Sequence, residues 1–289
     1  MIFMKVKTLT LTAPDYPERL RHIAGPPDQL FTIGHDVNEL LRQPCVAIVG
    51  SRKVSPYGKT VTLELTRALT RAGIVIISGL ALGVDSIAHT AALEAHGSTI
   101  AVLPSGLDRI YPATHRRLAA RIVEQGGALL TEYKPNSRIY ASSFIARNRI
   151  VSGLSDAVLI TEAAERSGTL STARFALEQG KEVLVVPGNI TSPTSAGTNN
   201  LIKAGATPVT HVNDMLRALG LADQAEKAAP QSSSPHEQIV LDLLFGGLTE
   251  GGELLQASKL DISLFNQTLT MLEIQGLIRP LGGNHWALA

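Results

Sequence analysis

Residues 142–149 place one aromatic side chain and two guanidinium groups close together. They read Ser-Ser-Phe-Ile-Ala-Arg-Asn-Arg in a chain that is only 4% aromatic and has a formal net charge of +1. Phe144 offers a ring face on which a base could stack, and Arg147 and Arg149 offer forks that match phosphate oxygens. Because the segment lies in a long connection between two strand-like runs, we expect it to serve binding more than folding. A nucleic-acid groove, a nucleotide site and a solvated loop all fit this composition.

A second candidate for anion binding follows the apolar run Val46–Val49. Residues 50–58 read Gly-Ser-Arg-Lys-Val-Ser-Pro-Tyr-Gly and lead into a helical pattern. Gly50 and Ser51 allow close backbone approach at a helix N-terminus, and Arg52 and Lys53 add positive charge, which suits a phosphate. The dinucleotide fingerprint G-x-G-x-x-G is missing. The spacing alone does not choose between a phosphate turn and a steric glycine beside a solvated arginine.

A third anion-binding turn is expected at Ser167, Gly168 and Thr169. These residues follow the run Ala157–Ile160 and begin a helical pattern, so their backbone N–H groups would form a cradle for an anion. Glu162 and Glu165 lie just before the turn as a possible carboxylate pair. No nucleophile or set of metal ligands accompanies them, so we predict no catalytic residue.

Composition restricts the class of protein further. The single cysteine, Cys45, excludes an intramolecular disulfide and indicates a buried thiol in a reducing compartment. The histidines show no spacing typical of metal ligands, and no cofactor is predicted. The apolar stretch at the N-terminus is too short for a signal peptide or a membrane span. We therefore expect a cytoplasmic protein that does not contact membranes.

Charge is distributed unevenly along the chain. Residues 45–216 contain 17 Lys and Arg against 12 Asp and Glu, whereas residues 236–289 contain two basic residues against six acidic ones. An anionic partner is therefore expected to dock on the larger, moderately basic part. This excess of positive charge is modest, and many globular domains reach it without binding nucleic acid.

Six short apolar runs alternate with helical patterns and predict the fold. They are Val46–Val49, Ile74–Ile77, Thr99–Leu103, Ala128–Leu130, Ala157–Ile160 and Val183–Val186. Continuous apolar strands alternating with helices indicate a mostly parallel sheet covered on both faces, that is, a doubly wound, Rossmann-like α/β domain. We assign it residues 45–220, with residues 1–44 as an extension that packs on its core. Ligands of such sheets bind beyond the carboxyl ends of the strands.

The C-terminal part predicts a separate small domain. Residues 221–235 lack an apolar period and end in a Ser/Pro cluster, which is typical of a linker. Three amphipathic helices then follow, at His236–Phe245, Gly252–Ala257 and Leu264–Gln275, before two strands around a Gly-Gly-Asn turn. This order predicts a winged helix over residues 236–289. Its third helix has no Lys or Arg, so we expect it to contact protein and not DNA.

Several ordered blocks resemble the DNA-processing protein A family (DprA, also called Smf). They cover residues 14–206 and include Asp15-Tyr16-Pro17, the Gly50-Ser51-Arg52 turn, Ser78–Asp85, Gly106-Leu107-Asp108 with Tyr111-Pro112, Arg147-Asn148-Arg149, Glu162–Thr169 and Val186-Pro187-Gly188. The resemblance implies an extended Rossmann-like domain that forms homodimers and binds single-stranded DNA without sequence preference. It also implies delivery of that DNA to the RecA recombinase and protection of incoming strands in natural transformation.

The resemblance also implies which residues hold the DNA. It assigns the grip to Arg52, to Phe144 as a stacking face and to the run Arg147-Asn148-Arg149. The turn Ser167-Gly168-Thr169 adds a phosphate contact. Two departures stand out: Ile145 occupies a position where many members have proline, and the small helical domain with which many members begin is expected to be missing here.

An enzyme is the alternative prediction. The phosphoribohydrolases that act on nucleoside monophosphates have a related fold and place a Pro-Gly-Gly-x-Gly-Thr turn before a glutamate-bearing helix. This chain has Ser171 and Thr172 where that group has acids. Without a carboxylate there, we see no group that would stabilise an oxocarbenium ion.

Overall fold

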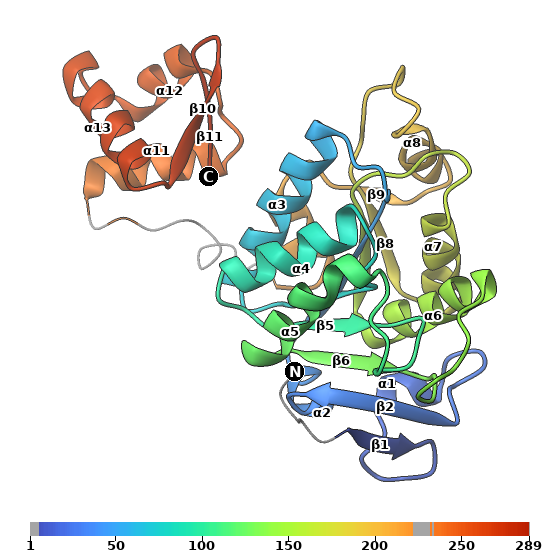
Figure 1. The fold of residues 1–289 in the computed structure, drawn as a ribbon. Coiled ribbons are helices and arrows are strands. Elements are labelled where there is room, and N and C mark those ends of the chain that lie inside the picture. Colours follow the sequence, from blue (N-terminus) through green and yellow to red (C-terminus); the bar gives the residue numbers. More distant parts are fainter. Residues whose placement is uncertain (1–5, 222–231, 233, 289) are drawn as a thin grey trace. The chain divides into compact units, whose positions relative to one another are not determined.

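The computed structural model describes residues 6–221, 232 and 234–288, which form two compact units divided between residues 222 and 223 (Figure 1). The division falls within the expected linker, of which residues 222–231 and 233 lie outside the described residues. No helix in the described part of the chain is long and apolar enough to cross a membrane.

The first unit is built on a nine-stranded sheet in the order β1-β2-β6-β5-β4-β3-β7-β8-β9. From β6 to β9 all neighbouring strands are parallel. The strands are β1 Lys7–Thr10, β2 Gln29–Gly34, β3 Cys45–Val49, β4 Val75–Ser78, β5 Thr99–Val102, β6 Ala128–Thr131, β7 Ala157–Ile160, β8 Glu182–Val185 and β9 Thr207–Pro208. The predicted doubly wound α/β class is confirmed.

Alternation of side chains along each strand explains why helices cover both faces. On β5, Ile100 and Val102 belong to one core cluster and Ala101 to another, because successive side chains point to opposite faces. Helices α6 (Ala141–Leu154) and α7 (Thr169–Glu178) close the first cluster. Helices α4 (Val84–Glu94) and α5 (Arg116–Glu124) close the second, next to α3 (Pro56–Arg71) (Figure 1).

The N-terminal segment enlarges the sheet itself. Strand β2 pairs antiparallel with β6, and β1 pairs antiparallel with β2. Two short helices, α1 (Glu18–Arg21) and α2 (Val37–Leu40), connect these strands to the core. Arg19 of α1 donates to the Asp156 carboxylate at 3.0 Å, next to the amino end of β7. The remaining short elements are η1 Ala113–His115, α8 Ala196–Lys203 and α9 Val212–Ala218.

Residues 142–149 do not form the solvated loop that their composition left open. The connection between β6 and β7 contains an irregular stretch and then the 14-residue helix α6. Ser143, Arg147, Ile150, Val151 and Leu154 are buried along it, which is the spacing of one helix face. Arg147 interrupts the apolar pattern of that face, so the helical period does not show in the sequence.

The second unit is a small helical domain with a hairpin. It contains α11 (Pro235–Phe245), α12 (Gly251–Ser258), α13 (Ile262–Ile274), β10 (Ile278–Gly282) and β11 (His285–Leu288). Val240, Leu254, Phe265 and Leu272 lie in its core. Gly283 and Asn284 adopt positive φ angles at the hairpin turn, which glycine and asparagine tolerate best. The predicted three helices and hairpin of a winged helix are confirmed.

Candidate nucleic-acid interface

The expected site lies along the edge where the parallel strands end. The strand order reverses between β3 and β7, so the loops after these two strands flank the point where open α/β sheets bind ligands. The structure joins these loops: the Ser51 N–H donates to the Glu162 carbonyl at 2.7 Å, and the Thr169 hydroxyl donates to the Gly50 carbonyl at 3.0 Å. Two of the three predicted anion-binding turns are therefore neighbours.

Phe144 and Arg52 meet at this edge. The Arg52 guanidinium carbon lies 5.0 Å from the centroid of the Phe144 ring, within the range of a cation–π contact. Tyr111, which follows β5, meets the same ring edge-on, with centroids 5.3 Å apart and ring planes at 71°. A small cavity of about 50 Å³ is bordered by these three side chains together with Arg147 and Gly79.

Arg147 is not the free fork that the sequence suggested. Its side chain is only 4% exposed and donates to the carbonyls of Gly79 and Val102, so α6 is clamped to the ends of β4 and β5. Burial lowers the pKa of Arg147 to about 10, partly offset by the charge of Asp85, and the group stays protonated at neutral pH. Arg147 therefore lines the small cavity with a side chain that is already bound to protein carbonyls.

Asp85 also holds the backbone at Gly79. Its carboxylate accepts from the backbone N–H groups of Gly79 at 3.0 Å and Ala81 at 3.3 Å. Burial raises the pKa of Asp85, while the nearby Arg147 charge lowers it. A Cβ on Gly79 would lie 2.2 Å from the Arg147 guanidinium, so only glycine leaves room for the clamp.

Arg149 is also engaged within the protein. Its guanidinium forms a two-pronged ion pair with Glu132, at 2.7 and 2.6 Å, and also donates to the Gly25 carbonyl at 2.9 Å. Both side chains of the pair are mostly buried. These contacts join the N-terminal segment, the end of β6 and α6.

We expect Arg149→Ala to act on stability and not on phosphate binding. The substitution leaves the mostly buried Glu132 carboxylate without its ion-pair partner, and the free energy of unfolding should fall by roughly 2–3 kcal/mol. Urea denaturation measures this loss. Titration of the folded variant with an oligonucleotide should give the same salt dependence as Arg42→Ala, which removes an exposed charge just before β3. A slope of log affinity against log salt that is reduced as for a lost phosphate contact would show that Arg149 contacts the DNA.

The remaining predicted residues lie on the two turns and between them; we call Gly50, Ser51, Lys53, Asn148 and Ser167–Thr169 the rim of the site. Asn148 donates from its amide to the Ser171 hydroxyl at 3.0 Å, which connects α6 to the first turn of α7. The Ser167 hydroxyl accepts from the Thr169 N–H at 3.2 Å, and the Ser51 hydroxyl accepts from the Lys53 N–H at 3.1 Å. Lys53 and Gly168 are exposed. A Cβ on Gly168 would meet nothing within 4 Å, so the turn is open on that side.

Sequence reasoning missed Tyr111, which was not among the predicted binding residues. The neighbouring His115 supports the local structure, since its Nδ1 lies 2.8 Å from the Leu80 carbonyl. The available signal was position: Tyr111 belongs to a polar loop that ends a parallel strand, so it had to lie on the same edge as Arg52. Its ring is 42% exposed and free to meet a ligand.

The described residues contain no group of three or more His, Cys, Asp or Glu side chains that could hold a metal ion. Glu162 is buried, and one of its oxygens accepts from the Ser55 N–H at 2.9 Å at the start of α3. His89 is fully buried, and burial lowers its pKa to about 3, so it is neutral, with Nδ1 2.7 Å from the Thr99 hydroxyl. The chemistry gathered at this edge is that of stacking and anion binding.

Two known proteins are similar in sequence to this chain. Protein Smf of Escherichia coli is 45% identical over 227 residues, which cover 78% of this chain and 60% of that protein. The DNA processing protein DprA of Bacillus subtilis is 39% identical over 214 residues, 74% of this chain and 71% of the relative. The chain thus matches less than two thirds of the length of the E. coli protein.

Two solved structures are similar to the first unit. DprA of Streptococcus pneumoniae superposes with a TM-score of 0.69 at 40% identity and covers 74% of this chain and 75% of its own. DprA of Helicobacter pylori, whose structure concerns its single-stranded DNA binding mode, gives a TM-score of 0.67 at 36% identity and covers 75% and 96%.

Family models account for both units. The model for DNA recombination-mediator protein A matches residues 7–220, and the model for the DprA winged helix domain matches residues 223–284. The matched ranges include the sheet, the Arg52–Phe144 contact, the three helices of the second unit and β10. The chain belongs to the DNA recombination-mediator protein A (DprA/Smf) family.

Proposed function

We propose that this protein binds single-stranded DNA without sequence preference, protects incoming strands and helps load the RecA recombinase in natural transformation and recombination. The observation that carries the DNA-binding part is the cluster of Arg52, Phe144 and Tyr111 over a small cavity at the ligand-binding edge of the sheet. The single-stranded DNA binding mode of the H. pylori relative supports the same assignment.

The cluster suits a single strand because every base has a π-face and every nucleotide a phosphate. An aromatic ring therefore stacks on any base, while arginines and free amides hold the backbone. The Arg52 guanidinium lies over the Phe144 ring. A base that stacks on that face has to displace it, and the released guanidinium is then available to a phosphate. Bases in a duplex are already stacked, so double-stranded DNA gains less from the ring.

Phosphate contacts are assigned to the rim of the site. We propose that Gly50, Ser51 and Lys53 hold the backbone on one side, and that the turn of Ser167, Gly168 and Thr169 with Asn148 holds it on the other. The exposed positions of Lys53 and Gly168 support this, as does the link between the two turns. Arg147 and Arg149 act in this proposal by fixing α6, and through it Phe144.

The RecA contact, the homodimer and a cytoplasmic location are parts of the proposal that rest on the family. For the winged helix we propose contact with a protein. Residues 236–289 carry two basic and six acidic residues, and α13 has no Lys or Arg along its length. A helix without positive charge is unsuited to the major groove of DNA.

The proposed role is binding without catalysis. Glu162 serves as a partner of the α3 N-terminus, and Ser171 and Thr172 lie in the first turn of α7 in place of acids. Neither arrangement offers a carboxylate to a sugar ring. Release of free base on incubation with nucleoside monophosphates would overturn this part of the proposal in favour of a phosphoribohydrolase.

Titration with matched single-stranded and double-stranded oligonucleotides tests the proposal. We expect tighter binding of the single strand, similar affinities for strands of different sequence, and a log–log salt slope of about −0.7 per phosphate contact. Fluorescence anisotropy over a series of salt concentrations measures all three. Equal or tighter binding of the duplex would contradict the assignment.

A further inference from the structure

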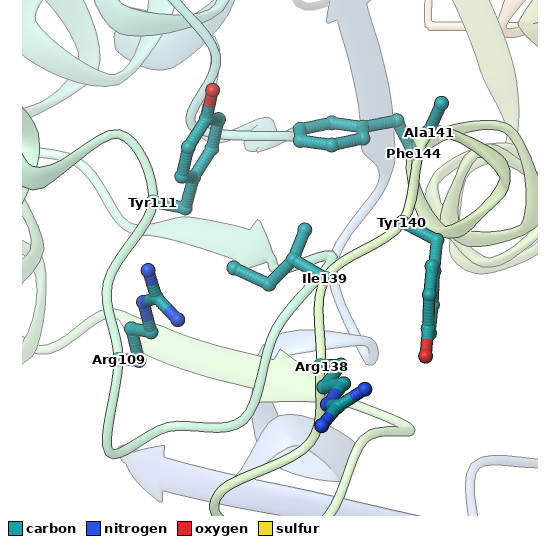
Figure 2. A pocket seen from close by; sticks show the side chains of 7 residues that line it. All are labelled: Arg109, Tyr111, Arg138, Ile139, Tyr140, Ala141 and Phe144. Carbon is teal, nitrogen blue, oxygen red and sulfur yellow. The ribbon is translucent and has the colours of Figure 1, made fainter.

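A larger cavity lies beside the site already described. It has a volume of about 530 Å³, within the range of small-molecule sites, and its lining consists of Arg109, Tyr111, Arg138, Ile139, Tyr140, Ala141 and Phe144 (Figure 2). Figure 2 shows Arg109 and Tyr111 on one segment of the chain and Arg138 and Ile139 on the segment that faces it. Phe144 closes one end, from the first turn of α6.

The two walls are held together by specific contacts. The Asp108 carboxylate, on the segment after β5, accepts from the backbone N–H of Asn136 on the opposite segment at 3.0 Å. A Cβ on Gly106 would lie 2.6 Å from the Lys134 carbonyl, so glycine is needed where the two segments approach. Asn136 adopts a positive φ of 62°, which asparagine tolerates better than most residues. The separation of the walls is therefore fixed by the Asp108–Asn136 hydrogen bond and by the close approach of the backbone at Gly106 and Lys134.

The lining is suited to an anion. It contains two arginines and no acidic residue. Among the described residues, neither the Arg109 nor the Arg138 guanidinium has a hydrogen-bond or ion-pair partner, and both residues are exposed. The first turn of α6 borders the cavity and has no acidic side chain. Its helix dipole therefore adds to the positive potential.

Tyr111 and Phe144 border both cavities. The small cavity also has Arg52 and Arg147 in its lining, and the large cavity has Arg109 and Arg138. The two rings, which meet edge to face, are thus shared by two neighbouring spaces that are each lined by arginines. Ligand groups in the two spaces would both contact these rings.

We propose that the large cavity is a second nucleotide subsite, and that the Tyr111–Phe144 pair separates two consecutive nucleotides of one DNA strand. This inference rests on the proposed single-stranded DNA binding and adds to it a defined neighbour for the nucleotide at Phe144. The base lies against Tyr111 and Ile139, and Arg109 and Arg138 hold the phosphates beside it. Opening one base step costs least in a strand that is already single.

The test compares Arg109→Ala/Arg138→Ala with a charge-matched control. Arg42→Ala/Lys203→Ala also removes two exposed positive charges. Arg42 lies just before β3 and Lys203 ends α8, which leads into β9, so both lie near the amino ends of parallel strands, at the edge of the sheet opposite the proposed site. Binding of oligothymidylates of increasing length is measured by anisotropy at constant salt. We expect wild type and control to gain affinity at the length that reaches the second subsite. The cavity variant should lack this gain and bind long strands at least tenfold more weakly, since each lost charged hydrogen bond is worth about tenfold.

The outcomes separate this inference from the proposed function. If the wild type binds long strands and the cavity variant matches the control at every length, the second subsite is wrong and the proposed function stands. If the wild type binds no single strand at all, both are wrong. Free thymidine monophosphate serves as competitor: displacement of a long strand at concentrations comparable with those of the strand itself would mean that the cavity takes a free nucleotide, and would overturn the subsite.

Crosslinking gives an independent readout. A strand with 5-iodouracil at each position in turn is irradiated on the wild-type protein, and the modified residues are found by mass spectrometry. We expect adducts on Phe144 from one position and on Tyr111 or Tyr140 from the adjacent position. Adducts on Phe144 alone, whatever the position of the label, would contradict the separation of two nucleotides by this aromatic pair.

Discussion

Phe144→Ala is expected to lower the affinity for an unstructured oligonucleotide about 5- to 150-fold, because stacking of one base on an aromatic ring is worth roughly 1–3 kcal/mol. The ring is the surface that Arg52 and Tyr111 both contact, so its removal also leaves both side chains without their partner. Anisotropy titrations of the wild type and the variant at one salt concentration measure the loss. Phe144→Trp should keep most of the affinity, since it retains a stacking face.

A matched control exists elsewhere on the chain. Phe175 on α7 also carries an arginine over its ring, with the Arg174 guanidinium carbon 5.2 Å from the centroid. Phe175→Ala therefore removes an equivalent aromatic–arginine pair outside the proposed site, and we expect it to leave the affinity unchanged. Equal losses in the two variants would mean that Phe144 acts through general stability and not through a base.

Salt dependence distinguishes the role of Phe144 from that of Arg52. Stacking releases no counterions, so Phe144→Ala should keep the wild-type slope of log affinity against log salt. Arg52→Ala removes one phosphate contact and should flatten the slope by about 0.7. Identical slopes in wild type and both variants, together with equal affinities, would refute the assignment of the groove.

The class of fold could be predicted because it depends on strongly periodic features. The continuous apolar runs Val46–Val49 and Ala157–Ile160 form the buried parallel strands β3 and β7. Each run ends at a clear boundary with polar or small residues, so the sequence also indicated the edge of the sheet at which the candidate site lies. The strand β2 was not predicted. It pairs antiparallel next to β6, and Gln29–Gly34 has only two fully buried side chains, so its apolar pattern is weak.

The composition of the site was predicted better than the roles of its residues. Arg52 and Phe144 contact each other, whereas Arg147 and Arg149 are held by protein carbonyls and by Glu132. Residue type cannot separate these cases, because a guanidinium fork fits a carbonyl or carboxylate as well as it fits a phosphate. The difference comes from position along α6: Arg147 is buried against the strand ends, whereas Phe144 lies nearly one turn nearer the helix N-terminus and is only partly buried.

Arg147→Met is expected to destabilise the first unit by about 3–5 kcal/mol, the usual cost of removing one charge from a buried pair. The variant leaves the carbonyls of Gly79 and Val102 without their donor and leaves the Asp85 carboxylate buried without a nearby cation. Urea denaturation at neutral pH measures the loss. In the Arg147→Met background, Asp85→Asn removes the unpaired buried charge and should restore part of the lost stability. The restoration is partial because the Asp85 carboxylate also accepts from two backbone N–H groups, which an amide cannot replace fully.

The pH dependence of this loss tests its physical cause. Burial already raises the pKa of Asp85 above its ordinary value of 3.8, and removal of the Arg147 charge raises it further. Between the unfolded and the folded pKa the native state of the variant then binds more protons than the unfolded state, so its stability increases as the pH falls. The difference between wild type and Arg147→Met should therefore shrink from pH 7 towards pH 5. A constant difference would mean that the lost carbonyl contacts account for the effect, and that Asp85 is held by its backbone donors alone.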